Sequence, residues 1–128
     1  MNPMLRCALL ATALVAPFAA TAQVARPFPA DALRAELQVL TAPEVLIAGK
    51  AARLAPGARI RGENNLLLMP GELAGARLLV HYTQEGDGLV QDIWVLNAAE
   101  RANKVWPNTR EQAARWRFDA ATQTWSRP

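Results

Sequence analysis

The chain has 128 residues, of which 14 are Lys or Arg and 11 are Asp or Glu. This length predicts one domain, and the near-balance of charge gives no support for a nucleic-acid-binding domain, a funnel for acidic substrates or a disordered tail. Alanine inflates the hydrophobic fraction of 52%, because 26 positions are Ala.

Residues 1–22 have the pattern of a secretory signal peptide. A single charge, Arg6, precedes the apolar run 8–16, and Ala20 and Ala22 supply the small residues that a signal peptidase reads. The run is shorter than the ~20 residues that span a bilayer, which disfavours a membrane anchor. We therefore predict cleavage between Ala22 and Gln23 and a periplasmic or secreted product. The mature chain would contain no cysteine and no transmembrane segment, so its fold would depend on packing and not on disulfides.

The mature chain divides into a short leader and one β-rich domain. Residues 23–30 contain two prolines and are expected to be loose, and residues 31–128 form the domain. The segment Asp31–Leu40 fits both a helical and a strand spacing of apolar residues. We favour a short helical turn followed by a strand that ends near Thr41.

The next forty residues carry turn signals between short apolar runs. A hairpin is predicted from Val45–Ile47 to Ala51–Leu54 around Gly49-Lys50. Pro and Gly in Ala55–Ala58 then suit a type II turn. In the strand that follows, Arg59–Arg61, we expect Ile60 to point inward.

The clearest unit is a long hairpin between Ala76 and Leu96. It turns at Glu85–Gly88, and its register depends on the length of that turn. If Asp87-Gly88 is a two-residue loop, Tyr82 faces Ile93 and His81 faces Trp94.

One or two short helices are predicted near residues 97–114, followed by a last hairpin. Asn97 and Glu100 form a capping box, and Thr109 repeats the signal. Short strands separated by Gly/Pro turns indicate a mainly β fold, a small antiparallel barrel or sandwich of short hairpins.

The residue inventory disfavours an enzyme. The mature chain has one Ser, Ser126 near its end, and one His, His81, so a catalytic triad is a poor expectation. A carboxylate pair for glycoside hydrolysis could be drawn from Glu85, Asp87 and Asp92. All three lie in or beside a turn, where acids are usually solvated turn formers. One His without Cys does not make a zinc site, and we expect no metal, no cofactor and no catalytic residue.

Arginines and tryptophans are the remaining candidates for binding. Arginine binds phosphate or carboxylate in bidentate geometry. The alternative is that these side chains are solvated strand faces in an Arg-rich composition. If Phe118 pairs with Gln123, Trp116 lies opposite Trp125, either as core or as a stacking platform for a sugar or peptide. The candidate basic face consists of Arg53, Arg59, Arg61 and Arg77.

The runs Leu54–Arg61, Asn64–Leu66 and Phe118–Trp125 resemble small uncharacterised exported proteins of Gram-negative bacteria. The resemblance covers most of the mature chain and implies export, and it brings no activity or binding residues with it.

Two functions follow as hypotheses. The first is a non-enzymatic exported module whose basic face binds an anionic envelope component: an acidic protein, a phospholipid or an anionic glycan. The alternative is a small-molecule or glycan carrier with an aromatic-lined barrel mouth. An open barrel lined by Trp would favour the carrier, and a filled interior with a flat basic face would favour the module.

Overall fold

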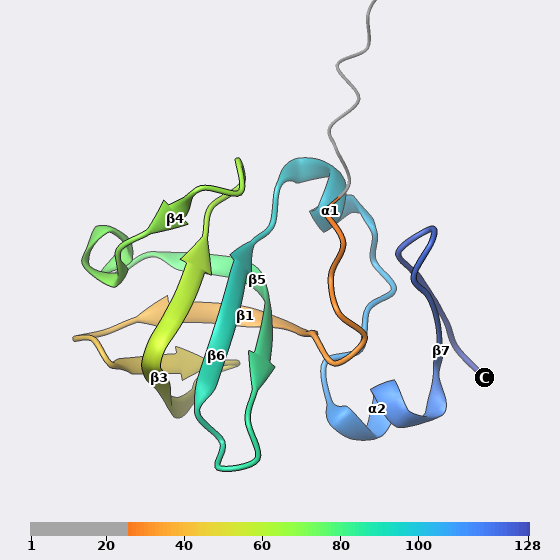
Figure 1. The fold of residues 1–128 in the computed structure, drawn as a ribbon, viewed down its shortest axis with the longest axis horizontal. Helices are drawn as coiled ribbons and strands as arrows, with labels where there is room; N and C mark the ends of the chain where they lie inside the picture. Colours follow the sequence, from red (N-terminus) through yellow and green to blue (C-terminus); the bar gives the residue numbers. More distant parts are fainter. Residues whose placement is uncertain (1–25) are drawn as a thin grey trace, which may run out of the picture.

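The computed structural model describes residues 26–128, so the predicted signal peptide and its cleavage site lie outside the described residues. Five strands form a barrel, and the C-terminal part of the chain packs on its outside (Figure 1). The barrel strands are β1 (Leu33–Val39), β2 (Glu44–Ile47), β3 (Lys50–Arg61), β5 (Arg77–Gln84) and β6 (Val90–Val95).

The barrel closes through a fifth pairing, between two strands that are already in the sheet. The strand order is β2-β1-β5-β6-β3, and an additional β2–β3 pairing joins the two ends. All of these pairs are antiparallel except β3–β6, which is parallel. A five-stranded barrel of this kind has the Greek-key architecture of OB-folds, and the predicted mainly β barrel is confirmed.

β1 confirms the predicted strand that ends near Thr41, but it begins already at Leu33. In place of the favoured helical turn, only a hydrogen-bonded turn precedes it, closed by Ala32 N–H donating to Pro29 O at 3.1 Å. The inward residues Leu37 and Val39 are 0% and 1% exposed, as the alternation predicts. β1 pairs with β2 on one side and with β5 on the other. This double pairing outweighs the helical spacing, because strand preference depends on neighbours more than on local propensity.

β3 runs through the segment where the sequence predicts a turn. Its first half pairs with β2 and its second half with β6, with a register shift between Leu54 and Arg59. Gly57 in this shift has φ +79°, a value that only glycine adopts without strain. The Pro-Gly signal therefore marks a bulge that bends one strand from one partner to the next. Ile60 is 2% exposed and points inward, as predicted.

The β5–β6 hairpin has the predicted pairs but not the predicted turn. Tyr82 lies opposite Ile93 and His81 opposite Trp94. The turn is closed by Gly88 N–H donating to Glu85 O at 2.9 Å, and Gly88 alone has positive φ within it. A register shift after Thr83 compensates for the longer turn, which restores the pairing that a two-residue loop would give.

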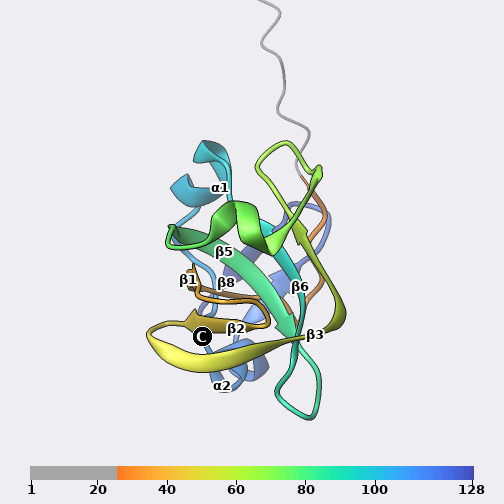
Figure 2. The same ribbon diagram turned by 90° about the vertical axis from the view of Figure 1, so that its left-hand side faces the viewer.

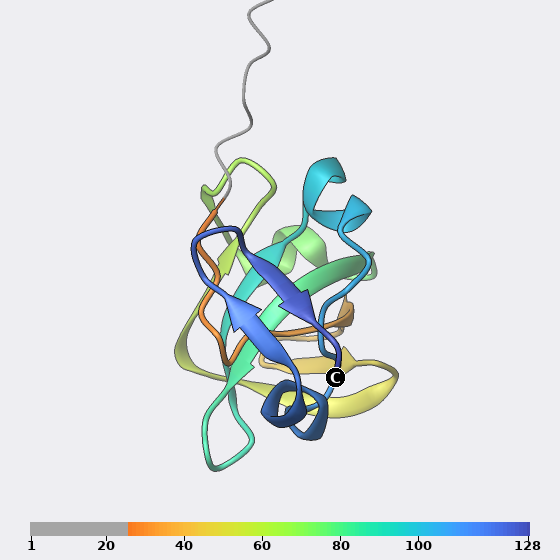
Figure 3. The same ribbon diagram turned by 90° about the vertical axis from the view of Figure 1, so that its right-hand side faces the viewer.

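The C-terminal segment, residues 97–128, covers one outer face of the barrel (Figure 3). Helix α1 (Ala98–Ala102) has the predicted Asn97–Glu100 capping box, and α2 (Arg110–Arg115) begins at the predicted N-cap Thr109. Strands β7 (Arg117–Asp119) and β8 (Thr124–Ser126) form the last hairpin.

The register predicted for this hairpin is wrong. Phe118 pairs with Trp125, not with Gln123, because the turn is two residues longer on the β8 side. Trp125 stacks on Phe118 with ring centroids 4.8 Å apart. The Arg127 guanidinium lies over the Trp116 ring, with its central carbon 5.3 Å from the ring centroid.

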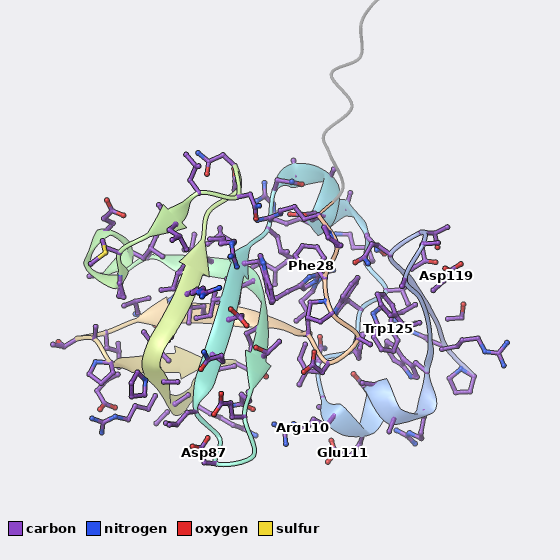
Figure 4. The ribbon with its side chains drawn as sticks, viewed as in Figure 1. Phe28, Asp87, Arg110, Glu111, Asp119 and Trp125 are labelled. Carbon is purple, nitrogen blue, oxygen red and sulfur yellow. The ribbon has the colours of Figure 1, made fainter. Side chains whose placement is uncertain are left out.

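Two hydrophobic clusters fill the molecule. The barrel interior holds twelve buried residues, mostly Leu, Ile and Val. A second cluster lies between the barrel and the C-terminal segment, where Phe28 and Trp125 are seen in Figure 4. Its buried members are Phe28, Ala32, Leu96, Trp106 and Trp125.

The predicted loose leader is corrected for the part that the structure describes. Arg26 and Phe28 are 7% and 5% exposed, because the C-terminal segment closes over them. No helix among residues 26–128 is long and apolar enough to cross a membrane.

Candidate functional site

A cavity of about 180 Å³ lies at the junction of the barrel and the C-terminal segment. The side chains of Phe28 and Trp106 supply aromatic surface, and Asn97 and Gln123 supply amides. The charged lining comes from Arg26, Arg34 and Glu100. Concave aromatic surface with a few convergent polar groups is typical of small-molecule sites.

Arg26 enters the site from the segment before β1. Its guanidinium forms a two-pronged ion pair with Glu100, with Nε 3.0 Å from Oε2 and Nη2 bonded to Oε1. It also donates to Gly62 O and Val95 O, both at 2.8 Å. Arg26 thus joins the barrel to α1 with nearly all of its donors used.

Arg34 points outward from β1 and is covered by the C-terminal segment, so only 8% of it is exposed. It donates to the carbonyls of Glu100, at 3.1 Å, and Asn103, at the end of α1. Its Nε and Nη2 lie 3.2 and 3.1 Å from His81 Nε2. All of these partners are neutral, and burial lowers the pKa of Arg34 while the Glu100 carboxylate opposes that shift.

His81 is a neutral imidazole in this cluster. Because Arg34 donates to Nε2, the ring proton must sit on Nδ1, and Nδ1 has no hydrogen-bond partner among residues 26–128. Burial, followed by repulsion from Arg34 and Arg26, lowers the pKa of His81 to about 2. The ring stacks on Trp106 at 4.0 Å and meets Phe28 edge to face at 4.4 Å.

Trp106 fixes the aromatic wall. Its indole Nε1 donates to Ala32 O at 2.9 Å, and Pro107 O accepts from the Arg34 backbone N–H at 3.0 Å. The ring therefore has a set position against the start of β1.

The formal charge of this cluster does not cancel. Arg26 and Arg34 are cations, His81 is neutral, and Glu100 is the one carboxylate among the described residues that line the cavity. The segment 1–25 contains no Asp or Glu that could add a charge. The cavity thus has a net charge of +1 in surroundings of low polarity, which favours an anionic occupant.

The four predicted arginines do not line this cavity. Arg53 precedes the bulge in β3 and is paired with Glu44 of β2 at 3.5 Å. Arg59 and Arg61 lie on the other half of β3 beside β6, and Arg77 begins β5 opposite Gln38 of β1. Each is exposed or half-buried, and no contact joins one of the four to another among the described hydrogen bonds and ion pairs.

Of the two predicted stacking residues, Trp125 is a buried member of the second cluster, 7% exposed, and Trp116 is half-buried at its edge. The aromatic cavity is lined instead by Phe28 and Trp106, on the outside of a filled barrel.

Sequence reasoning missed the cluster. Arg34 follows the alternation of a solvent-facing position, and Arg26 lies in the segment expected to be loose. Glu100 was identified for its capping box alone. No local spacing relates the arginines to the carboxylate, since Glu100 lies 74 positions after Arg26 and 66 positions after Arg34.

The described residues contain no group of three or more His, Cys, Asp or Glu arranged to hold a metal ion. No protein-family model, no curated protein and no solved structure matches this chain.

Proposed function

We propose that the protein is a non-enzymatic binding module whose cavity holds a small molecule with a carboxylate or an anionic group of similar size. The observation that carries the proposal is the cluster of two buried guanidinium groups with one carboxylate beside an aromatic-walled cavity. An anionic ligand would supply the missing negative charge through its attraction to the two guanidinium groups, whose hydrogen bonds go mostly to protein partners.

Binding without catalysis is supported by the state of the ionisable groups. The Glu100 carboxylate accepts from Arg26 and from the Asn97 backbone N–H at 3.0 Å. The basic nitrogen of His81 is occupied by Arg34. A general base needs a free lone pair aimed at the substrate. The basic nitrogen of His81 has none, and the Glu100 carboxylate is held by its ion pair with Arg26.

The size of the cavity limits the ligand. A cavity of ~150 Å³ is large enough to hold a benzene ring, so about 180 Å³ suits one ring or a short chain bearing an anionic group. Benzoate is therefore a suitable probe, with benzamide and benzyl alcohol as neutral compounds of nearly the same shape.

We expect calorimetric titration to detect benzoate binding and to find the two neutral compounds at least tenfold weaker. Ala99 lies on the exposed surface of α1 and lines the cavity, so Ala99→Leu should block it and reduce benzoate binding at least tenfold. Ala102→Leu, on the same helix and away from the cavity lining, is the matched control. Equal binding of benzamide would contradict the charge argument, and unchanged binding by Ala99→Leu would contradict the location.

A second candidate function is the binding of an anionic envelope component by the basic face. It is supported by the charges of Arg59, Arg61 and Arg77, which take part in none of the ion pairs formed by the described residues. Residues 1–25 contain no acid that could pair with them. Arg53 contributes less to this face because Glu44 already faces it.

For this second candidate we expect salt-sensitive binding to an immobilised sulfated glycan such as heparin, since exposed charges are screened at physiological ionic strength. The triple variant Arg59→Gln, Arg61→Gln, Arg77→Gln should elute at clearly lower salt than the wild type. The matched control, Lys104→Gln, Arg115→Gln, Arg117→Gln, has the same net charge as that variant. Equal elution of the two variants would show a response to net charge alone and no specific face.

A further inference from the structure

The exposed apolar side chains gather at one end of the barrel. Among residues 26–128, the large hydrophobic residues exposed to solvent are Leu40, Leu66, Leu67 and Met69, with 43%, 63%, 67% and 70% of their surface accessible. Three of them belong to the connection between β3 and β5, which contains β4 (Leu67–Leu68) and the 3-10 helix η1 (Pro70–Leu73). Such a concentration is unusual for a surface that faces only water.

Leu40 joins this group through tertiary contacts. Val39 bridges Ala74, and Gly75 N–H donates to Val39 O at 3.0 Å. The end of β1 is thereby held against the residues that follow η1, as seen in Figure 2, which faces this end of the molecule. We refer to Leu40, Leu66, Leu67 and Met69 as the end patch. It lies on the side of the barrel away from the C-terminal segment (Figure 1).

Two arginines flank the end patch. Arg61 pairs with Leu67 in the β3–β4 register, and Arg77 follows η1 at the start of β5. Neither forms an ion pair among the described residues. Glu63 is paired with Arg101 at 2.9 Å, whereas Glu72, which accepts from the Met69 backbone N–H at 3.0 Å, keeps its negative charge. Two arginines against this one carboxylate, which is unpaired among the described residues, leave a net charge of +1 beside the apolar residues.

We infer that the end patch docks on a lipid surface with anionic headgroups, with the Leu and Met side chains in the interface and Arg61 and Arg77 on the headgroups. This inference rests on the second candidate function and names its partner. Aliphatic insertion combined with nearby basic residues is the usual basis of reversible membrane attachment.

The composition of the patch favours lipid over a protein partner. Binding energy in protein interfaces is concentrated in Trp, Tyr and Arg that fill pockets of the partner. The end patch has no aromatic residue, and its exposed members are aliphatic side chains on two connections, with more than 60% of Leu66, Leu67 and Met69 accessible. Such side chains enter a fluid interface without needing a complementary surface.

The test is flotation of the protein, purified after expression of the full chain, with vesicles of phosphatidylglycerol and phosphatidylcholine or of phosphatidylcholine alone. The wild type should associate with the anionic vesicles and much less with the neutral ones. Leu66→Ser, Leu67→Ser, Met69→Ser together should reduce the partition coefficient by at least about a hundredfold, since each side chain loses its apolar transfer.

The charge is tested separately. Arg61→Gln with Arg77→Gln should reduce partitioning roughly thirtyfold at low salt, because each arginine near an anionic surface contributes roughly a fivefold factor. Lys104→Gln with Arg115→Gln, two exposed basic residues of the C-terminal segment, is the matched control and should bind nearly as the wild type does. Thermal unfolding of each variant checks the fold, and Arg77→Gln alone replaces the double variant if half-buried Arg61 proves necessary for stability.

Three outcomes would overturn the inference. The first is absence of wild-type binding to the anionic vesicles at low salt, even if heparin is bound. The second is a serine variant that floats as the wild type does, in which case the basic face acts without insertion and the second candidate function stands. The third is a dimer that the serine changes dissolve while no vesicle binds, which would assign the end patch to a second copy of the chain.

Discussion

Replacing Glu100 with Gln should lower the free energy of unfolding by about 3–5 kcal/mol, the cost of removing one partner from a buried ion pair. The Glu100 and Arg26 side chains are 12% and 8% exposed, so water cannot solvate the arginine left behind. Arg34 would lose its nearest negative charge at the same time. Gln keeps the size of the side chain and an oxygen for the Asn97 N–H, so the effect measures the charge.

Glu63→Gln is the matched control for this prediction. It also removes a carboxylate from an arginine, Arg101, at 2.9 Å, but the two side chains are 44% and 56% exposed. Exposed pairs contribute about 1 kcal/mol or less. The free energies of unfolding of the variants are compared by urea denaturation at neutral pH, monitored by tryptophan fluorescence. Similar small losses of unfolding free energy for both variants would mean that the carbonyls of Gly62 and Val95 are sufficient to stabilise the buried Arg26 charge. The argument that the cavity has an uncompensated positive charge would then lose its main support.

Acidification should destabilise the protein through His81 well before most carboxylates are protonated. The pKa of His81 is about 2 in the folded protein, because of burial and then of Arg34 and Arg26, against about 6.5 when unfolded. As the pH falls, the unfolded state takes up the His81 proton before the folded state does. The stability that neutral His81 contributes is therefore fully present above about pH 6.5 and is lost as the pH falls toward 2. The loss is about 1.4 kcal/mol per pH unit, or about 2.7 kcal/mol at about pH 4.5.

His81→Gln isolates this effect. Gln does not titrate, and its amide oxygen can accept from Arg34 in place of Nε2. Loss of the stacking on Trp106 should lower stability by the same amount at every pH. The diagnostic quantity is therefore the slope of the unfolding free energy against pH. We expect unfolding free energies of the wild type and of His81→Gln to converge between about pH 6.5 and 4.5. Parallel curves would show that His81 accepts a proton in the folded state.

The sequence alone predicts the local structure of this protein well where turns and caps decide it. The capping box at Asn97 and the N-cap at Thr109 are formed as expected, because these interactions involve residues within one helical turn. The inward position of Ile60 follows from strand alternation. The pairs of the β5–β6 hairpin are also predicted, although through a different turn and a compensating bulge.

Prediction fails where a segment receives its structure from distant partners. β1 is a strand because β2 and β5 both pair with it. The Pro-Gly signal in β3 becomes a bulge because β6 provides a second partner for the same strand. In the last hairpin Phe118 pairs with Trp125 and the two rings stack inside the second cluster, an arrangement that the turn residues alone do not indicate.

The sequence by itself determined the mainly β class, the two short helices, the absence of cysteine after residue 22 and the pattern of inward and outward residues. Only the tertiary structure decided which outward residues stay in water. The C-terminal segment covers Arg34 and His81, which alternation places on the surface, and burial then removes the proton from the imidazole and leaves two guanidinium groups with one carboxylate. A charge imbalance of this kind has no local signature, because it depends on which distant side chains are removed from water together.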